Sequence, residues 1–175
     1  SAHQLREPDF PDSVSEALTR SGVPAELLWL EVTETVMIND AALARITLDR
    51  LSDLGVRIAL DDFGTGFSSL SLLQKFPLQR IKIDRAFVRG VAENPNDRSL
   101  VRTIIILGNS LGMEIVAEGV ESMHQLQVLM DLDCEKAQGY LISHPVPPDA
   151  MRSTVAALSQ LDQFAGMRQS APLFN

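Results

Sequence analysis

The chain has 175 residues, of which 45% are hydrophobic, and this is enough to bury one sizeable core in a single domain. It has no run of about 18 apolar residues and no basic and apolar leader, so the sequence predicts neither a membrane-spanning helix nor a secretory signal. The single cysteine, Cys134, excludes an internal disulfide and favours a cytoplasmic location, and the net charge of −8 argues against binding to DNA or RNA polymers.

Short runs rich in β-branched residues alternate with stretches of helical periodicity along the chain. This alternation is typical of repeated strand-helix units, so we expect an α/β fold with a parallel sheet. The predicted strands cover residues 27–32 (LLWLEV), 56–60 (VRIAL), 80–83 (RIKI) and 114–117 (EIVA), with a weaker fifth at 135–138.

Helices are predicted between these strands from their capping residues and apolar spacing. Asp40 and Asp97 are each placed to cap a helix, and Ser122 with Gln125 forms the pattern of a capping box. A last helix is predicted after Pro148. The apolar positions predicted for the first two helices are Leu43, Ile46, Leu51 and Leu54, and Leu100, Val101, Ile104, Ile105 and Leu111.

Every predicted strand leads into polar or ionisable residues. The C-terminal strand ends of parallel α/β sheets and barrels carry the ligand site, because their loops vary while the sheet fixes their position. One acid at a strand end is more often a turn or a helix cap, but recurrence at five consecutive strands favours a site. The residues are Glu31, Asp61 with Asp62, Lys82 with Asp84, Glu118, and Gln138.

The adjacent acids Asp61 and Asp62 indicate a metal site. Successive strand side chains point to opposite faces, so both can serve one site only where the chain bends, and Gly64 and Gly66 permit such a bend. Two close carboxylates repel each other and either share a proton or bind cations, and oxygen-rich clusters suit Mg²⁺ or Mn²⁺. Lys82 beside them would balance the charge and orient a water molecule or a phosphate oxygen.

Other chemistries are poorly supported by the sequence. The stretch GTGFSS suggests a nucleophilic serine, but His3, His124 and His144 stand in unrelated contexts and none is placed to act as its base. Glu118 and Glu121 could be solvated residues of a strand and turn, but their recurrence beside the other acids favours site and supporting roles.

Five motifs together resemble the EAL-domain family in order and spacing. They are LEVTET (30–35), DDFGTGFSSL (61–70), IKIDRAFV (81–88), AEGVES (117–122) and QGYLISHPVP (138–147). The resemblance implies a modified (β/α)8 TIM-like barrel. It also implies a bacterial phosphodiesterase that opens cyclic di-GMP to linear pGpG, with Mg²⁺ or Mn²⁺ at a two-metal site and inhibition by Ca²⁺.

The resemblance assigns a role to each matching position. Glu31, Asp61 and Asp62 would be metal ligands, with Asp61 shared by two ions. Lys82 would contact the nucleophilic water, Glu118 would hold the metal-water network, and Gln138 would hydrogen-bond near the water or substrate. The supporting positions are Glu34, which would anchor the loop that contains Gly64 and Gly66, together with Asp84 and Glu121.

Two family features are absent from the sequence, namely the Glu-Ala-Leu signature and an Asn metal ligand. We therefore expect residues 1–162 to form a partial EAL domain that lacks its first strands, followed by a tail at 163–175. Phe67 stands where the family more often has Tyr, and His144 stands where Arg is common.

Three functions follow as alternatives. The leading one is hydrolysis of cyclic di-GMP, with this chain weak or inactive alone. The second is a receptor or scaffold that binds cyclic di-GMP without hydrolysis, and the third is a purely structural dimerisation module. A homodimer is expected through the helix after Asp84, and sensory or diguanylate cyclase domains or a membrane tether would belong to a longer parent protein.

Overall fold

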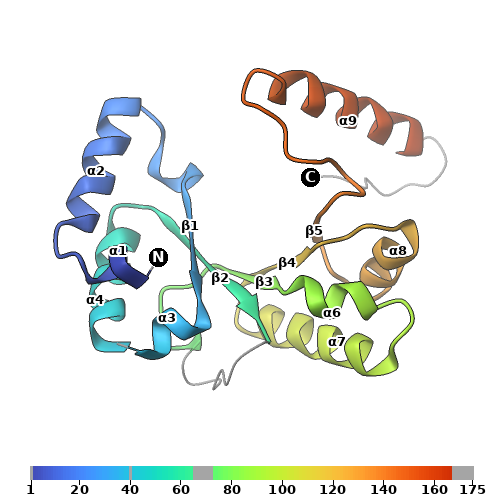
Figure 1. Ribbon diagram of the computed structural model, residues 1–175, viewed down its shortest axis with the longest axis horizontal. Coiled ribbons are helices and arrows are strands. Elements are labelled where there is room, and N and C mark those ends of the chain that lie inside the picture. Colours follow the sequence, from blue (N-terminus) through green and yellow to red (C-terminus); the bar gives the residue numbers. More distant parts are fainter. Residues whose placement is uncertain (1, 40, 65–72, 167–175) are drawn as a thin grey trace.

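A computed structural model of the chain describes residues 2–39, 41–64 and 73–166. This part contains a five-stranded parallel sheet in which the strands follow one another in chain order (Figure 1). The predicted α/β class with a parallel sheet is confirmed. The strands are β1 (Trp29–Thr33), β2 (Arg57–Phe63), β3 (Arg80–Ile83), β4 (Glu114–Glu118) and β5 (Lys136–Gln138).

The helices lie in two groups along this sheet (Figure 1). The helices α1 to α4 lie near β1 and β2, whereas α6, α7 and α8 lie near β3 and β4, and α9 stands apart from the rest. The helices are α1 (Ala2–Arg6), α2 (Phe10–Ser21), the 3₁₀ helix η1 (Ala25–Leu27), α3 (Glu34–Asn39), α4 (Ala41–Asp53), α6 (Arg85–Gly90), α7 (Pro95–Ser110), α8 (Met123–Asp131) and α9 (Met151–Gly166).

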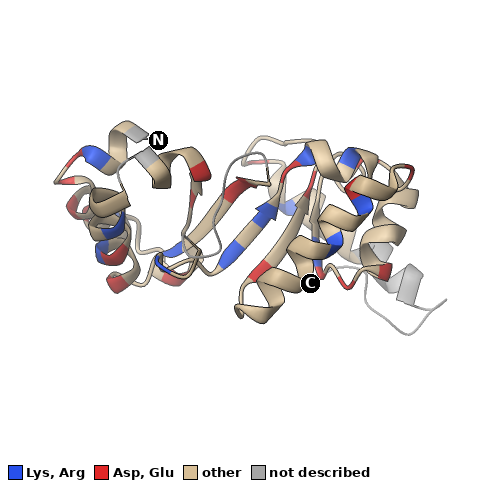
Figure 2. Ribbon diagram, turned by 90° about the horizontal axis from the view of Figure 1, so that it is seen from below, with Lys and Arg blue, Asp and Glu red and all other residues tan. Residues whose placement is uncertain are grey.

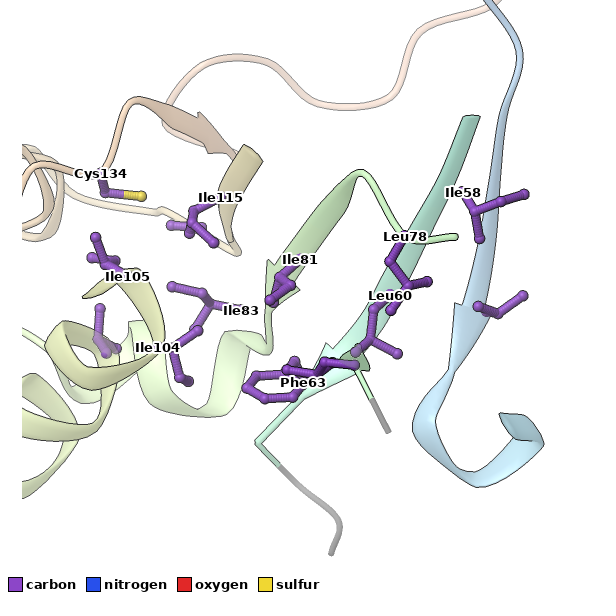
Figure 3. Close-up of a cluster of buried hydrophobic side chains, with 14 of the residues drawn as sticks. Ile58, Leu60, Phe63, Leu78, Ile81, Ile83, Ile104, Ile105, Ile115 and Cys134 are labelled. Atoms are coloured by element: carbon purple, nitrogen blue, oxygen red, sulfur yellow. The ribbon is translucent and has the colours of Figure 1, made fainter. Parts of the chain in front are cut away.

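One face of the sheet forms the hydrophobic core. Strand side chains alternate between faces, and the apolar set of each strand points toward the helices. Ile81 and Ile83 of β3 are fully buried and share a cluster with Ile104 and Ile105 of α7 (Figure 3). This packing fixes β3 and its neighbours, so the side chains on the other face hold defined positions.

The second face of the sheet is polar, and charged residues of both signs lie on the strands themselves (Figure 2). The strand register aligns this face, because Glu31 pairs with Ala59 and Arg80 pairs with both Ala59 and Glu114. Ala59 is fully buried but lies outside the main hydrophobic cluster, as expected for a residue on the opposite face. The residues of this face are Trp29, Glu31, Arg57, Ala59, Asp61, Arg80, Lys82, Glu114, Val116, Glu118, Lys136 and Gln138.

Two of the predicted helix details are wrong. Asn94, not Asp97, caps α7, and its side chain accepts a hydrogen bond from the backbone N–H of Asn96. Proline at the first position sets the earlier start, because its fixed φ suits a first helical turn. Ile46 of α4 is 60% exposed and Leu54, just after α4, is 37% exposed, although the helical spacing predicts that both are buried.

The other helix predictions fare better. The capping box of Ser122 and Gln125 is confirmed, and a helix does follow Pro148. Asp40 lies outside the described residues, as do 167–175, most of the predicted tail. No helix in residues 2–39, 41–64 and 73–166 is long and apolar enough to cross a membrane.

Candidate functional site

Lys82 lies at the centre of a cluster of acidic side chains on the polar face of the sheet. Its Nζ atom is 2.7 Å from Oε1 of Glu31, 2.9 Å from Oδ1 of Asp61 and 2.7 Å from Oε1 of Glu118. These residues come from β1, β2, β3 and β4, so the sheet brings together acids that are far apart in the sequence. Lys82 is 5% exposed and its ammonium is held by these carboxylates.

The charges of this cluster depend on one another. Burial alone would lower the pKa of Lys82, but the attraction of Glu118, Glu31 and Asp61 outweighs it and raises the pKa above its ordinary value. Lys82 therefore stays protonated near neutral pH. Burial raises the pKa of Glu118, and the negative charges of Asp61 and Glu31 raise it further, while Lys82 opposes the shift.

The carboxylates of Asp61 and Asp62 lie close together, because the backbone bends between them. Asp62 has φ +54°, a left-handed conformation that Asp tolerates better than most residues. One carboxylate oxygen from each of Asp61, Asp62 and Glu118 lies within 4.8 Å of the others. Sequence reasoning assigned the bend to the glycines, and it missed the contribution of Asp62 itself.

Asp84 connects this cluster to the next helix. Burial raises the pKa of Asp62, and a side-chain hydrogen bond with Asp84 and the charge of Asp61 raise it further. Asp84 also caps α6, since its Oδ1 accepts a 2.6 Å hydrogen bond from the N–H of Ala86. Asp84 thus links the carboxyl of Asp62 to the start of α6.

Glu34 contacts the backbone that follows Asp62. It is 3% exposed, and its Oε1 accepts a 3.1 Å hydrogen bond from the N–H of Gly64, while its Oε2 has no partner within the described part of the chain. Gly64 has φ +103°, and a Cβ there would lie 2.9 Å from the ring of Phe87. This position therefore requires glycine. Gly66 and Phe67 lie outside the described residues.

The two remaining predicted residues lie differently. Gln138 on β5 donates a 3.3 Å hydrogen bond from Nε2 to Oε1 of Glu118, so it joins the cluster at its edge. Glu121 is exposed, and its backbone N–H donates to Oε1 of Gln125 at the start of α8. It lines a surface depression with Arg85 and Arg89, whereas the carboxylates that contact Lys82 are those of Glu31, Asp61 and Glu118.

The residues present fit a hard divalent cation. Carboxylate oxygens are the ligands that Mg²⁺ and Mn²⁺ prefer, and three of them converge here. Oδ1 of Asp61 is buried and, apart from its ion pair with Lys82, it makes no well-directed hydrogen bond among the described residues. Four acids face one ammonium, so the cluster retains an excess of negative charge for a cation to balance.

Sequence reasoning missed a second set of charged side chains on the same face. Arg80, Glu114 and Lys136 form ion pairs nearer the strand starts, and Arg80 lies over the ring of Trp29. The sequence did contain a signal for this set. Arg80 and Glu114 are the first residues of predicted strands, and Lys136 lies two residues before Gln138 on the same strand.

Comparison with known proteins identifies the family of the chain. Residues 1–145 match the EAL domain family. The bifunctional diguanylate cyclase/cyclic di-GMP phosphodiesterase MucR of Pseudomonas aeruginosa is 41% identical over 156 residues, which is 89% of this chain and 23% of MucR. The chain spans between 18% and 25% of the length of the curated relatives that it matches.

Solved structures agree with this match. The MucR phosphodiesterase in complex with cyclic di-GMP superposes with a TM-score of 0.82 and 41% identity over 86% of this chain and 61% of that chain. The EAL domain of Mycobacterium smegmatis DcpA gives 0.84 and 40% identity over 89% and 70%. Klebsiella pneumoniae BlrP1, solved with cyclic di-GMP and either calcium or manganese, gives 0.77 and 32% over 81% and 36%. The chain belongs to the EAL domain family, whose solved relatives share its sheet.

Proposed function

We propose that this chain carries the catalytic cluster of a metal-dependent phosphodiesterase that opens cyclic di-GMP to linear pGpG. The observation that carries the proposal is the convergence of Glu31, Asp61 and Glu118 on Lys82, with Asp62 beside them. The complexes of MucR and BlrP1 with cyclic di-GMP support the choice of substrate.

The acidic residues would hold the metal. In this proposal Glu31, Asp61 and Asp62 are the metal ligands, with Asp61 shared between two ions, and Ca²⁺ is inhibitory. Mg²⁺ or Mn²⁺ bound there would supply Lewis-acid activation of the scissile phosphate and of the attacking water.

The other side chains would orient and stabilise the reacting groups. The Lys82 ammonium has three N–H donors, which face Glu31, Asp61 and Glu118, so it would donate to a water or a phosphate oxygen where a bound metal draws one of these carboxylates away. Glu118 accepts hydrogen bonds from Lys82 and from Gln138, and the amide oxygen of Gln138 would then accept a hydrogen bond from a water. These three are the proposed catalytic residues.

Supporting residues would keep this arrangement in place. Glu34 holds the backbone at Gly64, and Asp84 holds Asp62 and the start of α6. Glu121 and Gly66 are proposed as supporting residues only because they match the EAL domain family at these positions. We also retain residues 1–162 as the EAL unit, although α9 continues to Gly166.

Hydrolysis is the direct test of this proposal. Purified chain is incubated with cyclic di-GMP and Mg²⁺ or Mn²⁺, and pGpG is measured by chromatography. Asp61→Asn should abolish the slow turnover expected of the chain alone, whereas Asp53→Asn, an exposed acid at the end of α4, should not change it. Binding of cyclic di-GMP without formation of pGpG would favour a receptor or scaffold. If the chain neither binds cyclic di-GMP nor forms pGpG, the phosphodiesterase proposal is rejected.

The oligomeric state is a separate part of the proposal. We propose a homodimer through α6, where Arg85 and Arg89 border a surface depression with Glu121. Partner domains such as a diguanylate cyclase would belong to a longer protein, as in the bifunctional relative MucR. Light scattering that gives a monomer mass at all protein concentrations would reject the homodimer.

A further inference from the structure

A second row of side chains crosses the polar face of the sheet one layer away from the Lys82 cluster. We call Trp29, Arg80, Glu114 and Lys136 the Trp29 row. The guanidinium carbon of Arg80 lies 3.5 Å from the centre of the Trp29 ring. Arg80 donates from Nε at 3.0 Å and from Nη2 at 2.6 Å to Oε2 of Glu114, which also lies 3.1 Å from Nζ of Lys136. The row therefore connects β1, β3, β4 and β5.

The strand register explains how Arg80 reaches Trp29 across β2. Ala59 is the β2 residue that faces both Glu31 and Arg80, and its methyl group leaves room for a long side chain above it. Arg57 also lies near the ring, but its guanidinium carbon is 5.4 Å away. Arg80 is the better placed of the two, because a planar guanidinium can stack on an aromatic ring and donate to a carboxylate at the same time.

The Trp29 row and the Lys82 cluster use the same strands. Trp29 precedes Glu31 by two residues, and Arg80 precedes Lys82 by two, so each pair projects from the same face of its strand. In the described sheet β1 is an edge strand, paired with β2. The side chain of Glu31 is 48% exposed, yet its Oε1 remains 2.7 Å from Lys82.

We propose that Arg80 is a positioning residue for the acidic site. By joining Trp29 on β1 to Glu114 on β4, it holds the edge strand at the curvature that brings Glu31 to Lys82. The burial of Arg80 supports this role, since its side chain is 21% exposed and its charge is paired with Glu114 at 2.6 Å. The link to metal binding rests on the proposed function, but the link from Arg80 to the Glu31–Lys82 contact does not.

The first experiment measures the metal site. Manganese affinity is determined by calorimetry for the wild-type chain, Arg80→Met, Arg80→Lys and Arg57→Met. Arg80→Met should weaken Mn²⁺ binding about tenfold, as for groups that orient metal ligands. Arg80→Lys should weaken Mn²⁺ binding less than Arg80→Met does, because Lys keeps the positive charge but lacks the planar guanidinium that stacks on Trp29. Arg57→Met is the matched control and should bind Mn²⁺ like the wild type.

The second experiment measures the position of Glu31 without a metal. The ¹⁵Nζ resonance of Lys82 should shift in Arg80→Met in the same direction as in Glu31→Gln, and it should keep its wild-type position in Arg57→Met. Trp29 is the single tryptophan, so its fluorescence checks directly that the stacking contact is lost. Glu114→Gln, which leaves Arg80 in place, provides the same test if Arg80→Met does not fold.

The outcomes separate the two proposals. A wild-type chain that binds no Mn²⁺ counts against the proposed function, and the Lys82 resonance then decides the role of Arg80. If Arg80→Met changes the Trp29 emission but leaves both the Lys82 resonance and the Mn²⁺ affinity unchanged, Arg80 is a surface contact and the inference is wrong.

Discussion

The ammonium of Lys82 on β3 lies 2.7 Å from Oε1 of Glu118 on the adjacent strand β4. The contact joins a buried ammonium to a half-buried carboxylate. Burial alone would lower the pKa of Lys82, but the carboxylates around it raise that pKa, so the ammonium stays charged across the neutral pH range. Lys82 is the cation among the acids of the cluster. Substitution of Lys82 therefore distinguishes an effect on metal binding from an effect on hydrolysis.

We expect Lys82→Met to reduce pGpG formation by about 10²-fold or more, the usual size of the loss when a donor to the developing charge is removed. The carboxylates remain, so Mn²⁺ binding should persist in the same variant. Calorimetry and the hydrolysis assay measure the two effects separately. Lys75→Met, at an exposed lysine, is the control and should leave both unchanged. Wild-type turnover by Lys82→Met would contradict the role of Lys82.

We expect Glu114→Gln to destabilise the fold in a pH-dependent way. Burial alone would raise the pKa of Glu114, but hydrogen bonds and charges from Arg80 and Lys136 lower it below its ordinary value of 4.5. A lowered pKa in the folded state means that the ionised group stabilises the fold above pH 4.5, and that this contribution is lost as the pH falls through the folded-state pKa.

Urea unfolding measures this difference. Because the pair is partly exposed, the cost of Glu114→Gln near neutral pH should be about 1 kcal/mol or less, and it should shrink in acid as the carboxyl of Glu114 becomes protonated. Glu93→Gln, at an exposed acid on the surface, should show no such trend. A cost for Glu114→Gln that is equal at neutral and acid pH would refute the ion-pair explanation.

We expect Cys134 to be unreactive while the chain is folded. The thiol is 8% exposed and burial raises its pKa to about 11, so little of the nucleophilic thiolate exists near neutral pH. A chromogenic disulfide reagent should label it slowly in the native state and at once in urea. Rapid native labelling would mean that the contacts around β5 open readily.

We expect Ile81→Ala to cost about 2–5 kcal/mol of unfolding free energy, because it leaves a cavity in the core between β3 and α7. Ile106→Ala removes the same atoms from a side chain of α7 that is 61% exposed, and it should change stability by about 0.5 kcal/mol or less. Chemical denaturation compares the two variants. If Ile81→Ala and Ile106→Ala cost the same unfolding free energy, the packing of Ile81 against the buried face of α7 is wrong.

The sequence predicts the sheet and most of the acidic cluster because both depend on local patterns. Alternation identifies the strands, and polar residues at strand ends identify Glu31, Asp61, Lys82 and Glu118. The helices before Trp29 were not predicted, and the short helix after Asp84 was expected from the family resemblance and not from its own apolar spacing, which is too brief to be distinctive.

Contacts across the sheet were also beyond prediction. The Trp29–Arg80 contact depends on the register of three strands and on the small size of Ala59 between them. Periodicity within one strand contains no information on register between strands. The burial of Ile46 was predicted wrongly for a related reason, since helical spacing does not say which neighbours will cover a given side chain.

The strand order β1-β2-β3-β4-β5 repeats the order in which the ribosome makes the chain. Each new strand can dock beside the one just completed, so no strand has to be inserted between two that are already paired. Because Lys82 lies on β3 and Glu118 on β4, the ammonium emerges after Glu31 and Asp61 but before Glu118. During synthesis the growing sheet therefore never gathers all of these carboxylates without the cation that offsets their repulsion.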